Sequence, residues 1–128
     1  MEKKSNVAAE IIALEKSALE KWNQGNPSGY LEIFSTCITY FDPFQKARLD
    51  GFEVMETFYE SLRGKISVDS YEMLNPVVEV AGEMAVLSYH LTSHSGVEVY
   101  KWNCTEVYRM EAGNQWKIIH NHWSMING

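Results

Sequence analysis

The second half of the chain changes to a two-residue alternation of apolar and polar side chains, which strongly limits the fold it can adopt. Four long stretches carry this pattern: 66–80, 84–94, 98–111 and 115–126. Short glycine-containing segments at 81–83, 95–96 and 112–114 separate the four stretches, which favours consecutive antiparallel hairpins. Pro76 interrupts the first stretch, and a proline cannot donate to a strand ladder. We therefore expect four strands, with Pro76 at a bulge or a free edge.

The first half of the chain has helical spacing instead. Apolar residues recur on one face over 7–24, and a second short helix is expected to begin at Ser28. Asp50 and Glu53 fit a capping box for a third helix, which is expected to run to about Arg63. A short strand is expected over 37–42. Helices followed by a strand meander predict a single α+β domain over 1–128, with the helices on one face of the sheet.

Composition excludes several classes of partner. The chain has 128 residues and a formal charge of −6, and its eleven basic residues are scattered, so neither nucleic acid nor an anionic membrane is expected as a partner. The N-terminus is charged and then amphipathic, unlike a secretory signal, and we therefore expect a cytoplasmic protein. Two cysteines do not form a disulfide framework.

The last two strands determine which side chains face the interior. A two-residue turn at Gly113-Asn114 would pair Ala112 with Gln115, and hence Glu106 with Asn121. Asn121 and Trp123 would then share the interior with Glu106. The opposite, outer face would carry five polar residues that we expect at a subunit interface: Asn103, Thr105, His120, His122 and Ser124.

Several short motifs are similar to those of one superfamily. These are FDP at 41–43, DGFEVMETFYESL at 50–62, LNPVVEV at 74–80, LSYHLT at 87–92, TEVYR at 105–109 and WKIIHNHWS at 116–124. In this order and spacing the chain resembles the nuclear transport factor 2-like superfamily, which includes ketosteroid isomerase, scytalone dehydratase and the SnoaL-like polyketide cyclases. Within it, the resemblance is strongest to the association (hub) domain of calcium/calmodulin-dependent protein kinase II.

The resemblance implies three helices against a strongly curved, mainly antiparallel sheet that encloses a conical pocket. It also implies a homodimer through the outer sheet face. The pocket arginines of the association domain fall here on His90, Glu106 and Trp123, and a pocket histidine falls on Met55. Carboxylate binding is therefore not expected to carry over. The same match places His90 in the pocket, whereas the alternation of its own strand places it toward water.

Glu106 and His90 are the candidate catalytic residues. A carboxylate on an otherwise aromatic face would be desolvated, which raises its pKa toward a range useful for proton transfer. Alternatively, Glu106 pairs with a buried hydroxyl or with Asn121 and has a structural role. A hairpin centred near Gly96 would set His90 opposite Trp102, about 13 Å from Glu106 at ~3.3 Å per residue. His90 could assist a reaction from there, or could be a surface histidine.

The expected ligand is a small, largely apolar molecule, and no cofactor is expected. Its pocket would be formed by mainly aromatic side chains with a few polar ones: Trp22, Tyr30, Phe34, Tyr40, Asp42, Met55, Phe58, Trp102, Asn121 and Trp123. Asp42 precedes Pro43 and could instead serve only to open a turn. Such a pocket could support isomerase, cyclase or dehydratase chemistry by proton transfer. The alternative function is an assembly module without catalysis.

His120 and His122 lie one residue apart and would share a strand face, which raises the question of a zinc site. A zinc site needs at least a third ligand, and no carboxylate or thiol is evident on that face. We expect a hydrogen-bonded pair at the subunit interface and no metal.

Overall fold

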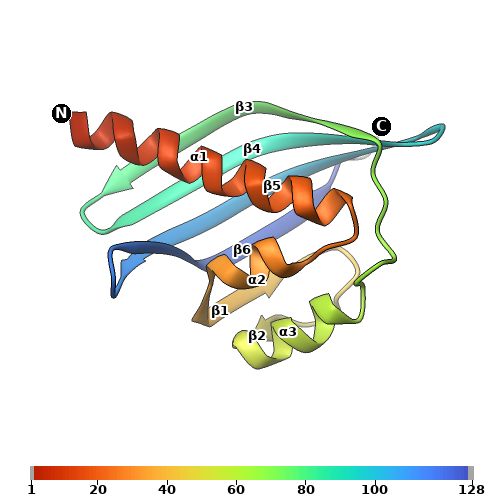
Figure 1. Ribbon diagram of the computed structural model, residues 1–128, viewed down its shortest axis with the longest axis horizontal. Coiled ribbons are helices and arrows are strands. Elements are labelled where there is room, and N and C mark those ends of the chain that lie inside the picture. Colours follow the sequence, from red (N-terminus) through yellow and green to blue (C-terminus); the bar gives the residue numbers. More distant parts are fainter. Residues whose placement is uncertain (1, 127–128) are drawn as a thin grey trace.

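A curved six-stranded sheet with helices across one face forms the fold (Figure 1). The computed structural model describes residues 2–126. In chain order the elements are α1 (Glu2–Asn23), α2 (Ser28–Ile33), β1 (Phe34–Phe41), β2 (Leu49–Asp50), α3 (Phe52–Glu60), β3 (Ser70–Ala81), β4 (Met84–Ser95), β5 (Glu98–Glu111) and β6 (Gln115–Met125). The strand order is β2-β1-β6-β5-β4-β3, and only the β1–β6 pair is parallel. The α+β class and the curved sheet expected from the sequence are confirmed.

The long helix α1 lies across the strands and buries one side against them (Figure 1). Ile11, Ala18 and Leu19 are buried on this side, as the helical spacing predicts. Glu15 lies among them and is also fully buried, which the apolar pattern does not predict. No helix in the described range 2–126 has the length and apolar character needed to cross a membrane.

Gly25 lies just after the end of α1 and packs against the segment that follows α3. Its φ is +83°, a left-handed conformation that favours glycine. A Cβ at this position would lie 3.1 Å from the Gly64 Cα and 3.1 Å from the Ile66 carbonyl oxygen. The Gly64 N–H also donates to the Gly25 carbonyl at 2.8 Å. The end of α1 is therefore packed directly against backbone at 64–66.

The start and end of α3 differ from the predicted helix. Gly51, not Asp50, occupies the N-cap position, and no side chain caps the helix. The Asp50 carboxylate instead accepts from the Arg48 guanidinium at 2.6 Å, so the predicted capping box is wrong. The regular helix ends at Glu60 rather than near Arg63, and turns lead on to Gly64.

Strand β3 lies at a free edge of the sheet and contains a bulge. Its pairing with β4 shifts between Leu74 and Val77, and Asn75 adopts a left-handed φ of 55°. Pro76 therefore lies within the bulge of an edge strand, where its missing N–H costs no ladder hydrogen bond. The predicted position of Pro76 is confirmed.

Strands β5 and β6 pair Glu106 with Asn121 as predicted, but the turn that joins the strands differs from the predicted one. Glu106 pairs with Asn121 and Cys104 with Trp123, as expected. The turn, however, pairs Glu111 with Gln115 rather than Ala112 with Gln115. A bulge at Ile119 then shifts the register by one residue, because Tyr108 pairs with Ile118 and Val107 with His120. Asn121 is consequently buried, whereas His122 is exposed on the other face.

Candidate functional site

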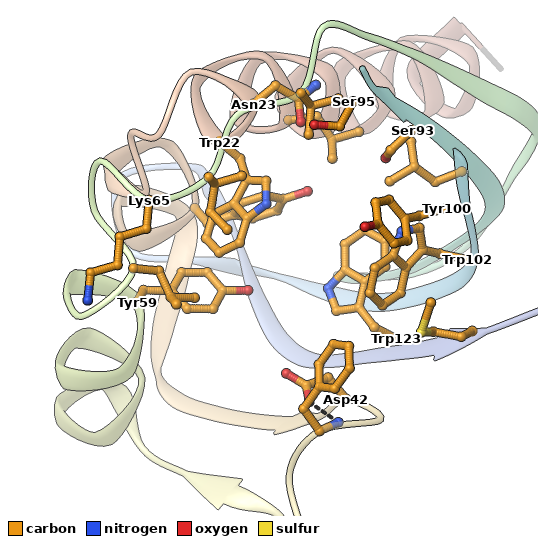
Figure 2. A pocket seen from close by; sticks show the side chains of 18 of the residues that line it. Trp22, Asn23, Asp42, Tyr59, Lys65, Ser93, Ser95, Tyr100, Trp102 and Trp123 are labelled. Carbon is orange, nitrogen blue, oxygen red and sulfur yellow. Dashed lines mark hydrogen bonds between the residues drawn. The ribbon is translucent and has the colours of Figure 1, made fainter. Parts of the chain in front are cut away.

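A cavity of about 600 Å³ lies between the helices and the concave face of the sheet (Figure 2). It extends to the loops after β1 and α3 and to one end of the β4–β5 hairpin. Most of its lining is aromatic or aliphatic. Seven of the predicted pocket residues line it: Trp22, Tyr30, Tyr40, Asp42, Phe58, Trp102 and Trp123.

Two groups of aromatic rings form the walls. On the β5–β6 side the indoles of Trp102 and Trp123 pack edge to face at 6.0 Å, and Phe44 packs against Trp102 at 6.2 Å. On the helical side Trp22 contacts Tyr59 at 4.7 Å between ring centroids. Rigid rings on both sides suit a flat apolar ligand, because such rings offer large contact area with little loss of side-chain entropy.

Asp42 brings a carboxylate into this aromatic setting (Figure 2). One carboxylate oxygen accepts the Phe44 backbone N–H at 2.8 Å, which is the turn contact considered for an Asp-Pro pair. The other accepts the Tyr40 hydroxyl at 2.8 Å. Asp42 therefore holds the loop after β1 and also lines the cavity, so the two alternatives for this residue are both realised.

The remaining polar groups of the lining lie around the aromatic rings (Figure 2). The Tyr59 hydroxyl points inward from α3, and burial raises its pKa well above the usual value. Ser93, Ser95 and Asn23 lie at one end of the cavity. Lys65 contributes to the lining, but its ammonium end points away from the aromatic rings.

A second polar cluster is buried between α1 and the sheet. Glu15 on α1 accepts three tyrosine hydroxyls, from Tyr30 at 2.7 Å, Tyr89 at 2.6 Å and Tyr108 at 2.8 Å. Burying a carboxyl group without hydrogen bonds is costly, and these three donors offset that cost. Tyr30 also lines the cavity, so this cluster touches the pocket through one hydroxyl-bearing ring.

Glu106 lies beside this cluster and is fully buried. Neither of its carboxyl oxygens has a hydrogen-bond partner within the described part of the chain. Burial, and then the neighbouring Glu15, raise the pKa of Glu106 well above its usual value, so the protonated form is favoured. Of the two alternatives, an interior carboxyl with a raised pKa fits, whereas a hydrogen bond between the Glu106 and Asn121 side chains is not present in the described part of the chain. The Asn121 amide instead accepts from the Trp123 indole N–H at 3.0 Å and donates toward Cys104 and the Thr105 carbonyl.

Five predicted catalytic or pocket residues do not line the cavity: four buried ones and His90. Glu106, Phe34, Met55 and Asn121 are all buried within the interior, but none belongs to the cavity lining. Glu106 is thus an interior carboxyl group as expected, although it has no surface toward the ligand space. The polar group that faces this space is Asp42.

His90 lies on the outer face, and its predicted inward position is wrong. It pairs with Asn103 rather than Trp102 and is exposed, while its neighbours Tyr89 and Leu91 are buried. The hairpin turn is one residue further along than predicted, because Ser95 pairs with Glu98. The His90 Nδ1 lies 2.8 Å from the Asn103 side-chain oxygen, so His90 is part of a surface polar network.

The five predicted interface residues all lie on this outer face. Asn103 links His90 to Ser124, whose hydroxyl accepts the Asn103 amide at 3.2 Å, and Thr105 pairs with His122 across the strands. His120 contacts the Thr39 hydroxyl at 2.7 Å through Nδ1. Burial, and then His122 and Arg48, lower the pKa of His120. Both histidines contact the Phe41 ring, at 5.6 and 5.0 Å between centroids.

One set of three side chains comes close enough to hold a metal, and it is not the histidine pair. Atoms of Glu15, Cys104 and Glu106 lie within 4.8 Å of one another in the described structure. Both oxygens of Glu15 already accept tyrosine hydroxyls, and burial raises the pKa of the Cys104 thiol. This chemistry describes a buried acid pair better than a set of ionised metal ligands.

Sequence reasoning missed several lining residues, most of them in loops or at strand ends. Phe44 lies in the loop after Asp42, and Tyr100 lies near the start of β5. Lys65, Ile66, Ser67 and Val68 belong to the segment between α3 and β3. Periodicity carries no information for such irregular segments. Tyr100 lies two residues before Trp102 on the same strand, so the two-residue alternation could have placed it on the same face.

Comparison with solved structures identifies several similar proteins. A candidate ketosteroid isomerase from Parabacteroides distasonis is 42% identical, with a TM-score of 0.84 over 91% of this chain and 86% of that one. The hub homology domain of calcium/calmodulin-dependent protein kinase II from Chlamydomonas reinhardtii is 21% identical, with a TM-score of 0.77 over 94% of this chain and 99% of that one. A nuclear transport factor 2-like protein of unknown function from Pseudomonas putida is 22% identical, with a TM-score of 0.83 over 94% and 87%.

No curated protein matches the chain at a significant level. The profile of one family, however, matches residues 7–127, nearly the whole chain. Together with the architecture of the fold, this match confirms the resemblance seen in the motifs. The chain therefore belongs to the calcium/calmodulin dependent protein kinase II association domain family, within the nuclear transport factor 2-like fold.

Proposed function

We propose that this protein binds a small, largely apolar molecule in the aromatic cavity, with Asp42 as its main polar contact. The observation that carries the proposal is the placement of the Asp42 carboxylate in a cavity of about 600 Å³ lined by Trp22, Trp102 and Trp123. A preformed, mostly apolar space with few polar groups is the usual form of a small-molecule site. The similar candidate ketosteroid isomerase supports a ligand of this class.

If the bound molecule is also converted, Asp42 is the group placed to move a proton. A general base must come within hydrogen-bond reach of the proton it removes. Glu106 and His90 do not meet the cavity, whereas Asp42 does. Tyr59 directs a hydroxyl into the same space and would be the polar group opposite a developing negative charge.

A ligand screen on the intact protein tests the binding function. Compounds that bind only the folded state raise the melting temperature, by an amount that grows with concentration. For a compound found in this way, Trp102→Ala should weaken binding at least tenfold, because it removes one wall of the cavity. Val86→Ala on the outer face is the matched control and should leave affinity unchanged. Equal affinity for the native protein and the Trp102 variant would place the ligand elsewhere.

A second candidate function, assembly, is supported by the outer sheet face. The family profile is that of an association domain, and hub domains are among the similar structures. The outer face presents the partly exposed Phe41 ring beside His120 and His122, together with the network of His90, Asn103 and Ser124. We propose that two copies associate through this face.

The mass in solution tests the assembly function. Light scattering after size-exclusion chromatography should give at least twice the chain mass for the native protein. Thr105→Arg places a charge in the centre of the outer face and should give a folded monomer. Glu10→Arg on the exposed side of α1, in the helical layer, is the control and should keep the native mass. A native monomer at micromolar concentration would rule out stable assembly and leave the cavity proposal intact.

A further inference from the structure

The charged groups of the cavity lining leave a negative charge beside the aromatic rings. Among the described residues that line it, two carry charged side chains, Asp42 and Lys65. The carboxylate of Asp42 lies among the rings, whereas the ammonium end of Lys65 is directed away from them (Figure 2). A ligand inside the ring of aromatic side chains would therefore meet one negative group and no positive one.

Three side chains of the lining donate their protons to acceptors within the protein. The Tyr40 hydroxyl donates to Asp42, the Tyr30 hydroxyl donates to Glu15, and the Trp123 indole N–H donates to Asn121. In each case the proton is already committed to an acceptor within the protein. These three groups are therefore not free to donate to a ligand, whereas Tyr59 directs a hydroxyl into the same space.

The rings near Asp42 are well suited to a positive charge. Phe44, Trp102 and Trp123 follow one another at 6.2 and 6.0 Å between centroids. Phe44 is also the residue whose backbone N–H binds the Asp42 carboxylate at 2.8 Å, so these two residues lie side by side at the cavity. The negative faces of aromatic rings attract cations, and tryptophan does so best. Aromatic rings beside a carboxylate are the usual way to hold an organic ammonium group.

We propose that the ligand of this cavity is an organic cation, an amine or quaternary ammonium group carried on an apolar skeleton, with its charge placed between Asp42 and the rings of Phe44, Trp102 and Trp123. This inference rests on the proposed binding function and specifies its substrate class. An anionic ligand is disfavoured, because it would face the Asp42 carboxylate without a compensating cation.

A matched series of probes tests the charge separately from the binding function. 2-Phenylethylammonium, 2-phenylethanol and phenylacetate share an aromatic ring and differ in charge. Titrated calorimetrically into the native protein at pH 7 and low salt, the ammonium compound should bind at least tenfold more tightly than the alcohol, and phenylacetate least tightly. Raising the salt concentration should weaken only the binding of the ammonium compound.

Two variants locate the effect. Asp42→Asn keeps an oxygen for the Phe44 N–H but removes the charge, and it should reduce ammonium binding at least tenfold, to the level of the alcohol. Binding of 2-phenylethanol should change less than threefold. Glu79→Gln removes the same unit of charge from the exposed edge strand and should leave all three affinities unchanged. If Asp42→Asn does not fold, Trp102→Leu should lower the preference for ammonium over alcohol.

The possible outcomes separate the two proposals. If the alcohol or phenylacetate binds as tightly as the ammonium compound, the inference about charge is overturned and the binding function stands. Ammonium binding that is unchanged in the Asp42→Asn variant overturns the inference as well. If none of the three probes binds with a dissociation constant below about 10 mM, both proposals fail.

Discussion

Glu15 on α1 and Glu106 on β5 lie side by side in the interior, with an oxygen of one within 4.8 Å of an oxygen of the other. Both side chains are fully buried. Their surroundings differ, because Glu15 accepts three tyrosine hydroxyls whereas Glu106 has no partner within residues 2–126. Two adjacent buried carboxyl groups cannot both ionise cheaply, so Glu106 is the member that keeps its proton.

Replacing Glu106 by glutamine should change how stability depends on pH. The pKa of Glu106 is raised in the folded state by burial and by Glu15, whereas in the unfolded chain a glutamate titrates near its ordinary value of about 4.3. Above that pH the unfolded state loses the proton first, so native stability falls as pH rises, by up to about 1.4 kcal/mol per pH unit, until the folded group also ionises. Glu106→Gln should remove this decline.

Urea unfolding of both proteins from pH 4 to pH 8 measures the effect. The glutamine variant should gain stability relative to the native protein as pH rises, while the exposed Glu79→Gln should follow the native curve. Parallel curves for the native protein and the Glu106 variant would mean that Glu106 does not retain its proton on folding.

Tyr89→Phe tests whether the tyrosine hydroxyls stabilise Glu15. The Tyr89 hydroxyl donates to Glu15 at 2.6 Å in a buried setting. Its loss leaves a buried carboxyl group with one donor fewer, which should lower the free energy of unfolding by about 1–3 kcal/mol. Tyr71→Phe is the matched control, because the Tyr71 hydroxyl binds Glu20 at the surface at 3.2 Å, and it should change stability by less than about 0.5 kcal/mol. Equal effects of the two variants would show that burial of the cluster has no energetic consequence.

The sequence predicted the order and type of the elements because they follow from periodicity, but the register depended on details it did not show. In β5–β6 the predicted turn was wrong by one residue, and the bulge at Ile119 shifted the pairing back, so Glu106 still faces Asn121. In β4–β5 no bulge compensates, so the predicted pairing of His90 with Trp102 is wrong by one residue, and the inward position that the resemblance implied for His90 is wrong as well. The strand's own alternation gave the correct face for His90.

The cavity lining was only partly predictable, because some of its residues lie in segments that have no periodic pattern. Its strand and helix residues, such as Trp22 and Trp102, follow from the faces of regular elements. Phe44 and residues 65–68 lie in segments without periodicity, and their position depends on tertiary contacts such as the one at Gly25. The burial of Glu15 was not predicted, since its acceptance of three hydroxyls is a property of tyrosines from three separate elements.

Gly25→Ala should destabilise the protein and loosen the rim of the cavity. The added Cβ would press on backbone atoms at 3.1 Å, and the residue would be held at a φ of +83°. We expect a loss of roughly 2–4 kcal/mol in unfolding free energy, from about 1–2 for the left-handed conformation and a similar amount for the contact. Gly96→Ala has a comparable φ of +62° with nothing within 4 Å of the new Cβ, so it should lose only the first part. A smaller effect at Gly25 than at Gly96 would show that the contact with 64–66 can relax freely.

Acidification should weaken the outer face through His120. Burial, His122 and Arg48 lower the pKa of His120 in the folded protein, so the unfolded chain takes up the proton first as pH falls through about 6.5. Stability contributed by the neutral imidazole is thus complete above that pH and decreases below it. If two copies associate through this face, the charge would also be buried between them, and the dimer should dissociate more readily at pH 5.5 than at pH 7.5.

Sedimentation velocity at the two pH values checks this expectation, with melting temperatures recorded in parallel. His120→Gln cannot become charged and should make both quantities less sensitive to pH. His94→Gln is the control, because His94 lies near the end of β4, contacts the exposed Glu72 and is remote in the sheet from β6. If the native protein and the His120 variant respond equally to acid, another group must be responsible, and His120 would contribute packing against Phe41 and Thr39 without acting as a titrating group.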